Sequence, residues 1–238
     1  MMWTLGILGA LGLMGAAYVS PHVGRWRAVR RMGRWCAERH ALALTYDDGP
    51  GPALTARVLD VLKARGARAT FFLLGSRAGD SPQMADRVRA EGHEAGCHTH
   101  DHLNAWKTWP WKARRDVARG YETLMTWVGA NGLFRPPYGK MTLLTAAEVW
   151  MRGARVGWWT LDSGDTWDTA PSVESTIERV RRAGGGVVLL HDFDRVGAGA
   201  EARAEFVMGV TTGLLELAEE EGWRVVTLGE VMEGAGLA

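Results

Sequence analysis

The sequence predicts an α/β protein with a mainly parallel sheet, preceded by a hydrophobic N-terminal helix. From residue 41 onward, short apolar runs alternate with longer amphipathic stretches, which is typical of consecutive βα units. The alternation repeats seven times over about 200 residues, which favours a closed or nearly closed barrel over a shorter doubly wound sheet. Residues 2–19, by contrast, contain no charged side chain.

The composition describes one globular domain rather than two. With 238 residues, 47% of them hydrophobic and 23% charged, the chain can bury a sizeable core and is not disordered throughout. The 28 basic and 27 acidic residues give a net charge of +1, which gives no reason to expect a nucleic-acid binder. Two cysteines, Cys36 and Cys97, are too few for a disulfide framework, so stability must come from the core.

Residues 1–20 are expected to form a membrane anchor or an uncleaved signal segment. The apolar run is close to the roughly 20 residues that cross a bilayer core. It lacks the basic start of a cleaved signal peptide, so retention is favoured over cleavage. Residues 21–40 are expected to form a basic juxtamembrane segment, because they contain six arginines and one glutamate. The positive-inside rule then favours the cytoplasmic side of the membrane.

Apolar residues recur at helical spacing among these arginines, at Trp26, Val29, Met32 and Trp35. This pattern predicts either a helix that lies on an anionic lipid surface with its aromatic side among the headgroups, or a solvated linker helix.

The remaining residues, 41–238, are expected to form a single domain of seven βα units. The predicted strands are 42–48, 69–75, 94–99, 133–136, 156–162, 187–192 and 224–228. Amphipathic stretches long enough for crossover helices include 52–65, 82–91, 111–128, 172–182 and 202–221.

Unusual polar residues cluster after these strands, where parallel α/β folds build their sites. Asp47 and Asp48 end the first strand and point to opposite sides if the chain is extended, so one can bind a cation while the other works as a base. The alternative is an ordinary turn at Asp-Gly-Pro. After the third strand, His98 and His102 can converge on one metal ion together with an Asp from another strand, which suits zinc or a similar divalent ion.

Two further clusters follow later strands. Arg135 can orient a carboxylate through a charge-assisted contact, or can form a surface ion pair. His191 ends a strongly apolar strand and can act as a general acid with a carboxylate adjusting its pKa, or can be a satisfied core histidine.

Taken together and in this order, the clusters resemble the motifs of the polysaccharide deacetylases with a NodB homology domain, carbohydrate esterase family 4. The motifs are Asp-Asp-Gly-Pro, His-Thr-x-x-His, Arg-Pro-Pro-Tyr, Asp-x-x-Asp and Leu-His-Asp, spread over residues 41–232. The resemblance implies a distorted (β/α)7 barrel related to the TIM barrel. It also implies a hydrolase that uses a divalent metal, Zn²⁺ by expectation, to remove N-acetyl groups from N-acetylhexosamine glycans of chitin or peptidoglycan type.

The resemblance also implies roles for individual residues. The catalytic residues would be the base Asp47, the general acid His191, and their partners Arg135 and Asp165. The metal ligands would be Asp48, His98 and His102. The Tyr138 amide would stabilise the oxyanion, and Leu189 and Trp167 would line the pocket for the acetyl methyl. The family places Trp directly after the second Asp of Asp-x-x-Asp, whereas Thr166 intervenes here, which puts the role of Trp167 in doubt. The Trp-rich stretch 106–111 is either a substrate wall or core.

Two alternatives stay open at this stage. The anchor and the arginines favour a deacetylase or deformylase of a lipid-linked amino sugar at the membrane face. The family resemblance implies a location outside the cell, whereas the arginines favour the cytoplasmic side, so the membrane face stays open. The second alternative is a catalytically silent glycan-binding module, although such a module has no chemical need for the base, the three ligands, the arginine and the acid histidine together.

Overall fold

A parallel sheet forms the centre of the computed structural model, which describes residue 15 and residues 18–237. Its strands are β1 (Ala41–Asp47), β2 (Thr70–Leu73), β3 (Glu94–Cys97), β4 (Leu161–Asp162), β5 (Gly186–His191) and β6 (Arg224–Val225). They lie in the order β3-β2-β1-β5-β4, with β6 paired to β1, and every pairing is parallel. Every residue of β1 is buried, as expected for a strand covered on both faces. The predicted parallel α/β fold is confirmed.

The predicted strand 133–136 is reduced to bridges at Phe134, and the predicted strand 156–162 to a bridge at Val156 and the short strand β4. Phe134 bridges to Cys97 on one side and to Val156 on the other, and no longer ladder forms at either place among the described residues. Pro136 and Pro137 follow Phe134 and have no N–H to donate to a neighbouring strand.

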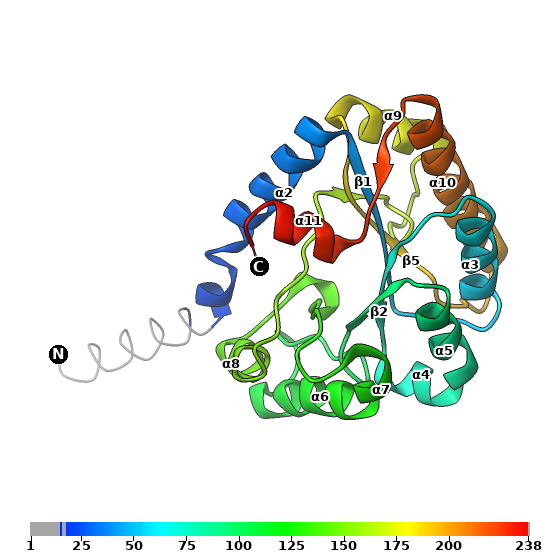
Figure 1. The fold of residues 1–238 in the computed structure, drawn as a ribbon. Helices are drawn as coiled ribbons and strands as arrows, with labels where there is room; N and C mark the ends of the chain where they lie inside the picture. Colours follow the sequence, from blue (N-terminus) through cyan, green and yellow to red (C-terminus); the bar gives the residue numbers. More distant parts are fainter. Residues whose placement is uncertain (1–14, 16–17, 238) are drawn as a thin grey trace, which may run out of the picture.

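Helices surround the sheet (Figure 1). They are α2 (Arg25–Arg39), α3 (Leu54–Ala64), α4 (Gly75–Asp80), α5 (Pro82–Ala90), α6 (Pro110–Thr123), α7 (Met125–Val128), α8 (Leu143–Met151), α9 (Val173–Ala183), α10 (Ala200–Glu220) and α11 (Leu228–Gly234), with short 3₁₀ turns η1 (Ser20–His22) and η2 (Pro137–Gly139). The final predicted strand, 224–228, ends early because Thr227 caps α11: its side chain accepts a hydrogen bond from the Glu230 amide.

Helix α2 packs on the domain rather than on a lipid surface. Met32, Trp35 and Cys36 are buried, and the helix lies against β1, β5 and α11 (Figure 1). Both interpretations of this segment, a helix with its apolar side among headgroups and a solvated linker helix, were therefore wrong for Met32 and Trp35, because protein side chains cover that side.

The predicted membrane-anchored location, with its transmembrane helix, was also wrong for the part of the chain that the structure describes. None of the helices in that part is long and apolar enough to cross a bilayer. Most of the expected anchor, residues 1–20, lies outside the described residues.

Candidate active site

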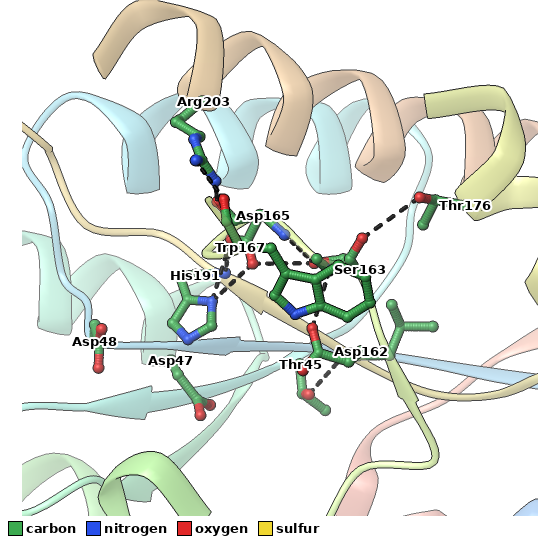
Figure 2. Close-up of polar contacts among 12 residues, drawn as sticks. Thr45, Asp47, Asp48, Asp162, Ser163, Asp165, Trp167, Thr176, His191 and Arg203 are labelled. Carbon is green, nitrogen blue, oxygen red and sulfur yellow. Dashed lines mark hydrogen bonds and ion pairs between the residues drawn. The ribbon is translucent and has the colours of Figure 1, made fainter. Parts of the chain in front are cut away.

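The predicted site residues follow strand ends at one edge of the sheet. Asp47 ends β1 and is in register with His191, which ends β5 (Figure 2). His98 directly follows β3. Since the strands run parallel, their carboxyl ends lie at the same edge, where α/β folds place ligands.

Asp48, His98 and His102 meet at one point. The Nε2 atoms of His98 and His102 lie 3.3 and 3.0 Å from Asp48 Oδ1, and one ligand atom from each residue falls within 4.8 Å of the other two. Burial opposes ionisation of Asp48, but the imidazoles of His102 and His98 outweigh it and hold the pKa of Asp48 well below its usual range. This carboxylate is therefore charged at neutral pH.

The hydrogen bond of His98 to a carbonyl oxygen is compatible with a cation between these groups. The Nδ1 atom of His98 lies 2.7 Å from the carbonyl oxygen of Arg135, which can only accept, so Nδ1 carries the proton. Metal binding requires the neutral imidazole, in which Nε2 is an acceptor that faces a carboxylate oxygen. Asp48 Oδ1 is buried and accepts no hydrogen bond from any described residue. Two facing acceptors, one of them an unpartnered carboxylate oxygen, suit a divalent ion with N and O ligands.

The backbone around this point is unusual. Of the described non-glycine residues with positive φ, only His40 lies elsewhere, and the others are Asp48, Thr99, His102 and Tyr138, with φ between 56° and 73°. Such conformations cost energy and occur where the surrounding structure requires them, often at functional sites. The Thr99 hydroxyl accepts from the His102 amide at 3.1 Å and supports the turn.

Asp116, on α6, holds the same turn and was not singled out from the sequence. It is buried, and its carboxylate accepts the backbone amides of Asp101 and Leu103 at 2.7 and 3.0 Å. These amides flank His102. A carboxylate on the apolar side of an amphipathic stretch is the sequence signal that points to such a role, because a buried charge needs partners.

Arg135 forms a buried ion pair with Asp47 and fixes the position of its carboxylate. The arginine is fully buried, and its Nη1 donates to Asp47 Oδ1 and to Thr45 Oγ1, both at 2.8 Å. Burial lowers the pKa of Arg135, and the Asp47 carboxylate opposes that shift. The second oxygen of Asp47, Oδ2, lies 3.8 Å from His98 Nε2 and thus faces the candidate metal site. One carboxylate oxygen is therefore fixed by Arg135, while the other faces the candidate metal site.

His191 pairs with Asp165 across from Asp47 (Figure 2). The imidazole Nδ1 donates to Asp165 Oδ1 at 2.9 Å, and the His191 amide donates to Oδ2 at 2.9 Å. Burial lowers the pKa of His191, but the charge of Asp165 and its hydrogen bond outweigh burial and raise the pKa to about 9. Arg203 fixes the Asp165 loop by donating to the carbonyls of Asp165 and Trp167.

The other predicted residues lie at the border of this cluster. The Tyr138 ring lies 4.7 Å from the His102 ring, and 59% of the residue is exposed. Leu189 is buried on β5, whereas Trp167 is 46% exposed and tied to its loop through the amide, which donates to the Gly164 carbonyl at 3.1 Å. The core interpretation of the Trp-rich stretch was wrong, because Trp106, Trp109 and Trp111 are exposed.

Comparison with known proteins gives concordant matches. Residues 35–156 match the family model described as polysaccharide deacetylase. A peptidoglycan-N-acetylglucosamine deacetylase of Bacillus cereus is 37% identical over 197 residues, which cover 80% of this chain and 87% of the relative.

The peptidoglycan-N-acetylmuramic acid deacetylase PdaC of Bacillus subtilis is 31% identical over 195 residues, 81% of this chain and 38% of that protein. The solved structure of peptidoglycan deacetylase PdaC has a TM-score of 0.69 with this chain at 27% identity, and covers 84% of this chain and 93% of the solved one. The chain therefore spans most of the first relative and well under half of the second.

Proposed function

Because the chain belongs to the polysaccharide deacetylase family, we propose that it hydrolyses N-acetyl groups of N-acetylhexosamine-containing glycans, of chitin or peptidoglycan type. The products are acetate and a free amino sugar. The observation that carries the proposal is the meeting of the Asp47–Arg135 pair with the Asp48, His98 and His102 cluster beside His191. The names of the two relatives favour a peptidoglycan-type substrate.

Asp48, His98 and His102 would hold a divalent metal ion, for which Zn²⁺ suits the two imidazoles and one carboxylate. When bound, such an ion polarises a carbonyl and lowers the pKa of water. The remaining steps fall to the protein's own side chains.

Asp47 takes a proton from the attacking water, and Arg135 keeps that carboxylate ionised and oriented. Attack on the acetyl carbon gives a tetrahedral oxyanion, to which the Tyr138 amide would donate. His191 then gives its proton to the amine nitrogen, the C–N bond breaks, and Asp165 balances the charge of the imidazolium throughout. Leu189 and Trp167 would contact the acetyl methyl.

The pairings also support a distorted (β/α)7 barrel. Bridges at Phe134 and Val156 link β3 to the segment that continues into β4, and β4 pairs with β5. The deacetylase domain would then comprise the predicted residues 41–238 together with α2, which packs on the sheet.

Replacing Asp47 by Asn tests the proposal. Acetate release from chito-oligosaccharides and from peptidoglycan should fall by about 100-fold to 10,000-fold, because the base is lost. Metal content, measured by atomic absorption, should not change, since Asp47 is not among the metal ligands. Asp80→Asn, an exposed carboxylate on α4, is the matched control and should retain activity.

An active, metal-replete Asp47→Asn variant would rule out the base assignment. If the wild-type protein releases acetate from no glycan tested, the chain is a silent glycan-binding module instead.

A further inference from the structure

Two adjoining hollows lie along the loop that follows β5, and one of them reaches His191. The larger hollow has a volume of about 520 Å³ and lies between the loop that joins β5 to α10 and residues of α4 and α10. Its lining includes Arg77, Phe193, Arg195 and Arg203. The second, of about 270 Å³, shares Phe193, Arg195 and Arg203 and reaches His191 itself. The space next to the candidate acid is therefore continuous with an arginine-lined surface, called here the arginine hollow (Arg77, Phe193, Arg195 and Arg203).

The three arginines of this hollow carry uncompensated charge. In the part of the chain that the structure describes, none of them lies within ion-pair distance of a carboxylate, whereas nearby Arg57 pairs with Glu205 at 2.5 Å. The guanidinium carbons of Arg77 and Arg195 lie over the Phe193 ring, 4.5 and 4.4 Å from its centroid. These contacts hold the side chains in place without neutralising them.

Arg195 also has a buried donor with nothing to bind. Its Nη2 is shielded from solvent and makes no hydrogen bond to any described residue. Burial lowers the pKa of Arg195; the Asp165 carboxylate opposes that shift and the Arg203 guanidinium adds to it. An unpaired buried N–H of a charged group is costly, and the planar guanidinium matches a carboxylate in shape and charge.

The carboxylates in the walls are engaged elsewhere. Asp194 accepts the amides of Ala53 and Leu54 at 2.9 and 2.7 Å, near the start of α3. Glu201 lies 3.6 Å from Arg57. Neither is in ion-pair distance of the arginine hollow, which therefore keeps its positive charge.

We propose that the arginine hollow binds a carboxylate group of the glycan substrate, carried either by the sugar itself or by a peptide attached to it. The proposal rests on the proposed function and narrows its substrate class to acidic glycans. Arg195 is the residue to change, because Arg77 donates to the Asp48 carbonyl and Arg203 holds the Asp165 loop, so their replacement would disturb the catalytic groups directly.

The experiment compares kcat/KM on three substrates. They are neutral chito-oligosaccharides, glycan strands whose muramic-type sugars bear free carboxylates after removal of the peptides, and the same strands with the peptides attached. In Arg195→Gln, the preference for carboxylated over neutral substrate should fall at least about tenfold, the loss expected for a charged hydrogen bond. The carboxylated substrate for which the kcat/KM ratio to the neutral substrate falls in Arg195→Gln identifies the source of the carboxylate. Arg224→Gln changes an exposed arginine at the opposite end of the strands and should keep the wild-type preference.

A salt series supplies a second measurement that needs no variant. Sodium chloride should reduce the wild-type preference for carboxylated substrate, because it screens a charge contact. An unchanged preference in Arg195→Gln overturns the proposal, and if that variant does not fold, a preference that does not respond to salt overturns it.

Failure of the proposed function gives a different result. In that case the wild-type protein releases acetate from no substrate, and calorimetry of the carboxylated strands with the wild type and Arg195→Gln still tests the hollow. Equal binding by the two proteins overturns the proposal.

Discussion

The buried guanidinium of Arg135 and the partly buried imidazole of His191 carry positive charge at the candidate site. Arg135 donates to Asp47 and Thr45 through Nη1, to the Gly157 carbonyl through Nε at 3.0 Å and to the Trp158 carbonyl through Nη2 at 3.4 Å. These directed donors explain why arginine rather than lysine suits this position, because an ammonium cannot reproduce the planar fork. Arg135 thus fixes the carboxylate without blocking its second oxygen.

The pair of His191 and Asp165 predicts a pH dependence. The pKa of His191 is about 9, so the imidazole is protonated at neutral pH and loses its proton as the pH rises through that value. Activity should therefore fall on the alkaline side near pH 9. In Asp165→Asn the pKa of His191 should drop, because the charge of Asp165 no longer outweighs the effect of burial. The alkaline limb of the kcat/KM profile should then move to lower pH.

Asp168→Asn is the matched control, since Asp168 is exposed on the same loop. Its alkaline limb should match that of the wild type. An alkaline limb in Asp165→Asn at the wild-type position would show that Asp165 does not set the proton affinity of the acid.

At the residue level, site residues could be predicted from the sequence where they lie in dense polar motifs, and could not be predicted where they lie outside such motifs. Asp47, Asp48, His98, His102 and His191 could be named because each sits at a strand end beside other polar residues. Asp116 and Arg77 reach the same site from helices α6 and α4, as charges within amphipathic patterns rather than in motifs at strand ends. Only the folded contacts, to the Leu103 amide and to the Asp48 carbonyl, give them a role.

At the level of elements, the predicted strands match the structure where their backbone pairs with the backbone of a neighbouring strand. β1 was expected at 42–48 and spans Ala41–Asp47. The segment 156–162 was expected as one strand, but only Val156 and β4 pair. Between them the carbonyls of Gly157 and Trp158 accept from the Arg135 side chain. An apolar run in the sequence does not show that its carbonyls bind the Arg135 side chain instead of the backbone of a neighbouring strand.

Helix α2 shows a second limit at this level. Its amphipathic pattern was visible, but an apolar helix side looks the same whether lipid or protein covers it. The structure covers it with the domain, so Met32→Ala should lower the free energy of unfolding by about 2 to 4 kcal/mol through the cavity it leaves. Denaturant unfolding measures this change.

Arg34→Ala on the exposed side of α2 serves as the control for Met32→Ala and should change stability by less than about 0.5 kcal/mol. Equal, small effects of the two substitutions would contradict the packing of α2 on the domain.

For the molecule as a whole, the candidate metal site links three separate chain segments. Asp48 follows β1, while His98 and His102 follow β3, and Arg135 orients His98 through its carbonyl. A ligand that binds only the folded state stabilises it by mass action. Added Zn²⁺ at 100 times its dissociation constant should stabilise the protein by about 2.7 kcal/mol, a rise in Tm of roughly 5 to 10 °C for a domain of this size.

The His102→Ala variant lacks one ligand and should show little or none of this rise in a differential scanning experiment. A full Zn²⁺-dependent rise in His102→Ala would place the metal elsewhere. This readout does not depend on catalysis, so it separates metal binding from the proposed reaction.

The contact of α2 with the floor of the site bears on how this domain can be transplanted. Arg25 lies over the rings of Trp158 and Trp159, at 4.6 and 4.8 Å, and the Trp158 carbonyl accepts from Arg135. A graft that begins at residue 41, or at residue 35 where the family similarity starts, would remove Arg25 from these indoles, and the Trp158 carbonyl is bonded to the arginine that holds the proposed base Asp47. We expect chimaeras cut ahead of Arg25 to keep the site intact, and those cut behind it to lose order at Trp158 first.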